Sequence, residues 1–121
     1  MKKLLLLMFI SLPAFSEIMT LECIYPNYSD AAGVYKTKSA FGFKFVSDTK
    51  TEKTYLTGSN GSSEVLKVPR ADGGMNYVEI AATGNVMITT VLPRGDSVHS
   101  RNSAIGGQFV ASQYFGSCKV T

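Results

Sequence analysis

Residues 40–46 read AFGFKFV, with phenylalanines at every second position: Phe41, Phe43 and Phe45. Successive side chains of a β-strand point to opposite faces of a sheet, so this spacing predicts a strand with one aromatic face directed at a core. After residue 16 the chain keeps no apolar period of about 3.6 residues, the mark of an amphipathic helix. The sequence therefore predicts a β-protein.

Turn residues divide the rest of the chain into further short strands. Asn60-Gly61 is typical of a tight hairpin, and Pro93 and Gly106-Gly107 mark other breaks. About eight strands spaced about 8–12 residues apart are the pattern of an all-β barrel or sandwich. Because short hairpin links favour an antiparallel up-and-down order, we predict a small up-and-down β-barrel, with a sandwich as the alternative. The expected strands are 17–25, 40–46, 53–57, 64–68, 75–81, 86–92, 97–105 and 108–116.

The first residues of the chain have the features of a secretory signal. A positive start and an apolar run occupy residues 2–10, and Ala14-Phe15-Ser16 supplies small residues for cleavage before Glu17. The apolar run is too short to cross a bilayer, which takes about 20 residues. We expect a signal peptide at 1–16, a single β-domain at 17–121, no membrane span, and a periplasmic or secreted location.

Cys23 and Cys118 are the only cysteines, and they stand near the two ends of the expected domain. Two cysteines exported to an oxidising compartment are expected to pair. A disulfide between the first and last strands places them side by side, which closes a barrel of up-and-down order. The chain lacks a C-x-x-C motif and has a single histidine, so we expect neither a redox site nor a metal site.

The charge pattern argues against some partners. The chain has 12 Lys and Arg residues against 9 Asp and Glu, and two of the lysines belong to the expected signal peptide. Because the remainder carries no basic run, nucleic acid is not an expected partner. We expect no cofactor, and a protein or glycan of the cell envelope as the partner.

Residues 95–103 depart from the pattern of the other strands, because neither face of this segment is apolar. Such departures tend to collect at functional sites. We interpret the segment as an exposed polar edge or loop, or as a binding surface, and in either case expect its side chains to contribute little to the core. The candidate binding residues are His99, Arg101, Asn102, Gln113 and Tyr114.

Catalysis is the least favoured function. A catalytic triad would have to combine His99, the only histidine, with Asp96 and a serine. The chain has no G-x-S-x-G nucleophile elbow and no convincing pair of acidic residues. We therefore do not expect an enzyme, and a hydrolase that uses His99 is kept as an alternative.

The layout resembles that of small bacterial secreted or periplasmic β-proteins with a disulfide between their two ends. The shared features are the early cysteine, the Phe43-Lys44-Phe45 strand, and a Ser-x-x-x-Gly-x-Cys ending at residues 112–118. This resemblance implies no function. A weaker, fold-level likeness is to the periplasmic lysozyme inhibitors, which are small barrels that insert a loop into an enzyme cleft. Residues 58–63, GSNGSS, are loosely similar to their Ser-Gly-x-Gly-x-x-Tyr loop.

Together these patterns predict an exported, non-catalytic binding module, for which inhibition of a cell-envelope enzyme is one possible role. A purely structural component of the envelope is the alternative. If the segment 95–103 is not the binding site, the loop at residues 58–63 is the next candidate.

Overall fold

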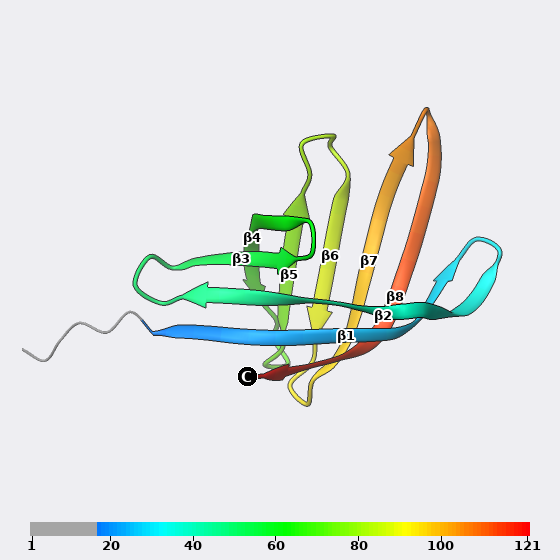
Figure 1. Ribbon diagram of the computed structural model, residues 1–121. Coiled ribbons are helices and arrows are strands. Elements are labelled where there is room, and N and C mark those ends of the chain that lie inside the picture. The colour runs from blue at the N-terminus through cyan, green and yellow to red at the C-terminus, as the bar shows by residue number, and fades with distance from the viewer. Residues whose placement is uncertain (1–16) are drawn as a thin grey trace, which may run out of the picture.

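The computed structural model describes residues 17–121, which form eight antiparallel β-strands closed into a barrel (Figure 1). Each strand pairs with the next along the chain, and the last pairs with the first, which confirms the predicted up-and-down barrel. Within these residues no helix is long and apolar enough to cross a membrane. The predicted signal peptide, 1–16, lies outside the described residues. The strands are β1 (Ile18–Asp30), β2 (Gly33–Asp48), β3 (Lys53–Gly58), β4 (Gly61–Pro69), β5 (Met75–Ile80), β6 (Val86–Val91), β7 (Asp96–Ile105) and β8 (Gln108–Val120).

The aromatic stretch that predicts the fold lies in β2 and supplies much of the core. Phe43 and Phe45 are buried, and Phe41 on the same face packs against them while partly exposed. The ring of Phe45 stacks on that of Tyr77 from β5, with 4.0 Å between the ring centroids. At this level the barrel is therefore filled by side chains, as expected for a barrel of eight strands.

The predicted disulfide joins the two strands at which the barrel closes. Cys23 on β1 and Cys118 on β8 are direct partners in the antiparallel register, with 4.0 Å between their Cα atoms. Both residues are buried. The disulfide therefore links the first strand to the last from inside the barrel.

The hairpin of β1 and β2 is longer than the sequence predicts, with strands of 13 and 16 residues. Its tight turn is held by the carboxylate of Asp30, which accepts hydrogen bonds from the backbone N–H groups of Ala32 and Gly33 at 2.8 and 3.2 Å. The register of β1 shifts around Pro26, which has no N–H to give to a ladder. Because of this irregularity, the alternation of apolar and polar residues does not predict the second half of β1.

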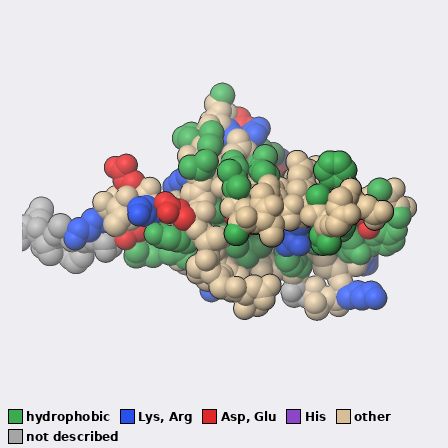
Figure 2. Space-filling view, turned by 90° about the horizontal axis from the view of Figure 1, so that it is seen from above, with side chains coloured by type: hydrophobic (Ala, Val, Ile, Leu, Met, Phe, Trp, Pro, Cys, Tyr) green, Lys and Arg blue, Asp and Glu red, His purple; other side chains and the backbone are tan. Residues whose placement is uncertain are grey.

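One end of the barrel, which we call the open end, carries the four hairpin turns at residues 31–32, 59–60, 81–85 and 106–107. Residues 17 and 121, the two ends of the described part of the chain, and the other three links lie at the opposite end (Figure 1). Figure 2 shows the molecule from above, with hydrophobic side chains spread over the face that is in view. Among the exposed hydrophobic residues are Ile105 and Phe109, which flank the turn between β7 and β8.

Candidate functional site

The polar face of β7 points into the barrel, which corrects the expectation of an exposed edge or surface. Ser97 and His99 are only 4% and 2% exposed, and Arg101 and Ser103 on the same face are partly buried. β7 pairs with β6 on one side and with β8 on the other. The prediction that these side chains contribute little to the core is therefore wrong for Ser97 and His99.

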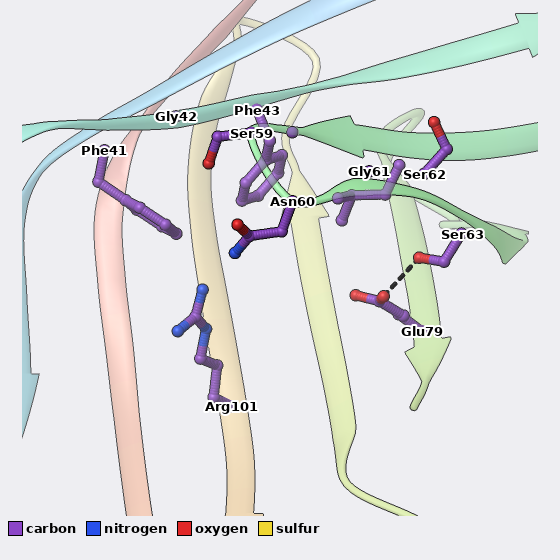
Figure 3. Close-up of a pocket in the computed structure, with 12 residues that line it drawn as sticks. Phe41, Gly42, Phe43, Ser59, Asn60, Gly61, Ser62, Ser63, Glu79 and Arg101 are labelled. Carbon is purple, nitrogen blue, oxygen red and sulfur yellow. Dashed lines mark hydrogen bonds between the residues drawn. The ribbon is translucent and has the colours of Figure 1, made fainter. Parts of the chain in front are cut away.

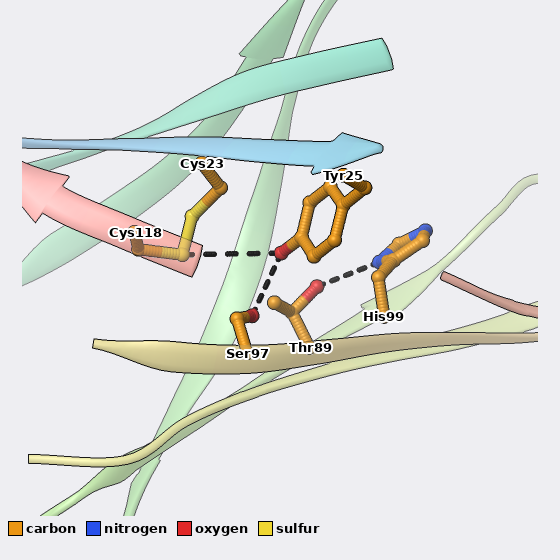
Figure 4. The surroundings of a disulfide bond; sticks show 6 residues. All are labelled: Cys23, Tyr25, Thr89, Ser97, His99 and Cys118. Atoms are coloured by element: carbon orange, nitrogen blue, oxygen red, sulfur yellow. Dashed lines mark hydrogen bonds between the residues drawn. A yellow bond between two sulfur atoms is a disulfide. The ribbon is translucent and has the colours of Figure 1, made fainter. Parts of the chain in front are cut away.

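Ser97 on β7 is accommodated in the interior by a hydrogen bond with Tyr25 on β1. Its hydroxyl oxygen lies 2.8 Å from that of Tyr25, which also lies 3.9 Å from the Sγ atom of Cys118 (Figure 4). Burial raises the pKa of Tyr25 to about 12, so its hydroxyl keeps its proton at neutral pH. Because a buried hydroxyl is costly without a partner, this pair explains how a serine can stand in the core.

His99 has both ring nitrogens engaged. Nδ1 lies 2.7 Å from Oγ1 of Thr89 on β6 (Figure 4), and Nε2 lies 3.2 Å from Nε of Arg101. The arginine can only donate, so Nε2 must accept and the ring proton must sit on Nδ1, which donates to Thr89. Burial, and then the charge of Arg101, lower the pKa of His99 to about 3. The imidazole is therefore neutral at physiological pH.

Asp96 and His99, which a catalytic triad would have to combine, do not lie together in the barrel. Asp96 points away from the interior, with its side chain 68% exposed and 3.9 Å from that of Arg94. His99 lies on the interior face of the same strand. With a strongly lowered pKa and both nitrogens occupied, His99 is poorly suited to take a proton from a nucleophile. Within residues 17–121 no group of three His, Cys, Asp or Glu residues could hold a metal ion.

Arg101 is held in place by rings and by the histidine. Its Cζ atom lies 5.0 Å from the ring centroid of Phe41 and 5.0 Å from that of Tyr114. The centroids of these two rings are 4.5 Å apart. Nε is engaged by His99, and Figure 3 shows the guanidinium beside Phe41 and directed toward Asn60. Within residues 17–121 Arg101 forms no salt bridge. The cation is thus positioned but not neutralised by a carboxylate.

Two adjoining hollows lie at the open end, with volumes of about 320 and 210 Å³. Both are lined by Phe43, Leu56, Glu79 and Arg101, so they form one space with an apolar wall and two charged groups. The turn at residues 58–63 covers one side of the larger hollow (Figure 3). We call this space the mouth.

Glu79 on β5 is the anionic group of the mouth. It accepts a hydrogen bond from the Oγ atom of Ser63, and Figure 3 shows its carboxylate directed into the space beside that serine. In the described part of the chain Glu79 forms no salt bridge, with Arg101 or with any other residue. Two opposite charges therefore face the same hollow without pairing.

The five residues that the sequence nominated divide between the two faces of the sheet. His99, Arg101 and Tyr114 lie on the interior face, where Tyr114 is the register partner of His99. Asn102 and Gln113 lie on the outer face and are exposed, and Gln113 donates from its side-chain amide to Ser100. The structure thus brings three of the candidates together and separates them from the other two.

Sequence reasoning did not nominate Glu79, or Phe41 as a partner of Arg101. The signal for Glu79 was present, because it follows Met75 and Tyr77 on one face of an expected strand. A carboxylate that ends an otherwise apolar face is expected to reach the rim of the core. The second candidate of the sequence, the loop 58–63, lines the same hollow as Arg101, so the two candidates are parts of one site.

Comparisons of this chain with protein-family models, with curated proteins and with solved structures found no match. The resemblances drawn from the sequence are therefore supported only in their structural part, the barrel and its disulfide.

Proposed function

We propose that this protein is an exported, non-catalytic binding protein, and that its partner inserts a polar group into the mouth. The observation that carries the proposal is the state of Arg101, a half-buried cation without a carboxylate partner in residues 17–121. Charges withdrawn from water are normally paired, because desolvation costs several kcal/mol or more per ion. A partner group of opposite charge supplies the missing pair.

The fixed position of Arg101 also suits binding. Its guanidinium packs on Phe41 and Tyr114 and donates to His99, so few conformations remain to be lost when a partner binds. Immobilising a flexible side chain costs about 0.5–1.5 kcal/mol at an interface. Arginine is also enriched among the residues that contribute most to binding.

The same observations rank the alternatives. A purely structural role gives no reason to keep two opposite charges facing a hollow without pairing them. A hydrolase needs a base, and His99 is a poor one because burial and Arg101 lower its pKa to about 3. Inhibition of a cell-envelope enzyme is a form of the binding function in which the partner is that enzyme. Export rests on the signal-like residues 1–16 and on the disulfide, which is typical of oxidising compartments.

Affinity capture tests this proposal. Residues 17–121 with the disulfide formed are immobilised, exposed to an extract of the cell envelope, and the bound proteins and glycans are identified by mass spectrometry. Arg101→Gln removes the positive charge of the mouth, whereas Asn102→Ala changes the next residue of β7, on the outer face. We expect the wild type and Asn102→Ala to capture the same partner, and Arg101→Gln to capture at least ten times less. Equal capture by a folded Arg101→Gln variant, checked by circular dichroism, contradicts binding in the mouth.

A further inference from the structure

We infer that the group bound in the mouth is zwitterionic, with a carboxylate held by Arg101 and an ammonium held by Glu79, as in a short peptide with free ends. This inference rests on the proposed binding function and specifies its ligand. It follows from the two unpaired charges, from the donors and acceptors that each has left, and from the size of the space.

The two charged residues stand on the same inner wall of the barrel, two strands apart, and do not form a salt bridge with each other. Met87 on β6 is the register partner of both Glu79 and Arg101, so the two lie two strands apart around the barrel. Neighbouring strands are about 4.8 Å apart, which puts their Cα atoms about 10 Å apart. Both side chains line both hollows, and within residues 17–121 they form no salt bridge with each other. A ligand that enters between them meets a positive and a negative group.

The remaining donors of Arg101 favour a carboxylate. Nε is used by His99, which leaves the two terminal nitrogens as a pair of parallel donors. Such a pair matches the two oxygens of a carboxylate in a bidentate arrangement. A phosphate offers similar oxygens but up to two negative charges, and the carboxylate of Glu79 in the same hollow repels the additional charge.

The remaining acceptor capacity of Glu79 favours an ammonium. One of its oxygens, Oε2, accepts a hydrogen bond from Ser63, and the other is available in the hollow. An ammonium has three donors and a positive charge, which together complement the unpaired carboxylate. The two hollows, of about 320 and 210 Å³, together lie in the lower half of the range of small-molecule sites, about 300–1,000 Å³. The space therefore suits a peptide of two or three residues.

Four matched probes separate the two charges. The alanyl-alanine dipeptide is used with free ends, with an acetylated amine, with an amidated carboxyl, and with both ends blocked. Binding to residues 17–121 is measured by NMR titration at pH 7. We expect the free dipeptide to bind most tightly, each single block to weaken binding at least tenfold, and the doubly blocked probe to bind weakest. This series uses the wild type alone, so it stands even where a variant is unstable.

Variants assign each charge to its residue. With Arg101→Gln the affinity should no longer depend on amidation, and with Glu79→Gln it should no longer depend on acetylation. Lys119→Gln and Glu64→Gln remove the same charges from exposed positions outside the mouth and should preserve the wild-type order of the probes.

The outcomes distinguish the inference from the proposed function. If an envelope partner is captured through Arg101 but the four probes bind equally or not at all, the zwitterionic ligand is wrong and the binding function stands. If only amidation matters, the ligand is a simple anion, which also overturns the inference. If the probes fail and capture does not depend on Arg101, both are wrong.

Discussion

Arg101 donates from Nε to Nε2 of His99, two residues earlier on the interior face of β7, at 3.2 Å. This hydrogen bond fixes the proton of the imidazole on Nδ1, where it faces Thr89. It also orients the guanidinium, whose terminal nitrogens extend toward the mouth. A buried, neutral histidine thus acts as a positioning residue for the cation that we propose to bind the partner.

The low pKa of His99 makes the stability of the barrel depend on pH. The ordinary value is 6.5 and burial lowers the pKa to about 3 in the folded state, so between these values the unfolded chain binds one more proton. The free energy of unfolding is therefore expected to fall by about 1.4 kcal/mol per pH unit on acidification through this window. Above pH 6.5 the contribution of the neutral histidine to stability is fully present. Urea unfolding of the wild type and of His99→Gln at several pH values between 7.5 and 4.5 measures this. Parallel profiles for the two proteins contradict the assignment.

The pair of Tyr25 and Ser97 predicts a non-additive effect on stability. Tyr25→Phe and Ser97→Ala each leave one buried hydroxyl without its partner, and each should cost about 1–3 kcal/mol. The double variant removes both hydroxyls and should be more stable than the sum of the two losses implies. A double-mutant cycle in urea gives the coupling, and a coupling near zero contradicts the importance of this hydrogen bond.

The disulfide should contribute strongly to stability, because it closes a long loop. Cys23 and Cys118 are 95 residues apart in the sequence, and in the simple chain-entropy model such a link stabilises the fold by about 4–5 kcal/mol. Replacing both cysteines by serine should lower the melting temperature. Mass analysis without reduction should find no free thiol, whereas two free thiols in the exported protein contradict the bond.

Processing of the chain can be checked directly. The apolar run and Ala14-Phe15-Ser16 predict cleavage before Glu17. N-terminal sequencing of the protein recovered from the export compartment should begin at Glu17 or within one or two residues of it. A full-length product held in the membrane contradicts this expectation.

Local sequence patterns were sufficient for the architecture of the barrel. The alternating phenylalanines of β2, the Asn60-Gly61 turn and the two cysteines all lie where the pattern placed them. The phenylalanine spacing and the Asn-Gly turn are local signals. The two cysteines require only that the ends of the domain lie side by side. The second half of β1 escaped prediction because Pro26 interrupts its register.

The orientation of β7 could not be predicted from its own residues. Its inward serine and histidine are acceptable in a core only because Tyr25 and Thr89 supply partners from other strands. Those partners become neighbours only when the barrel closes. The separation of Asn102 from Arg101, by contrast, follows from the sequence alone, because adjacent residues of a strand point to opposite faces of the sheet.

Binding in the mouth is tested most directly by the NMR signal of the Nε–H group of Arg101, assigned by its disappearance in Arg101→Gln. A sample of residues 17–121 labelled with nitrogen-15 is titrated with the partner purified by affinity capture. We predict that the largest shifts occur at this side-chain signal, at Glu79 and at the turn 58–63. Shifts confined to Asn102 and Gln113 on the outer face, with the Arg101 signal unmoved, would contradict the proposal.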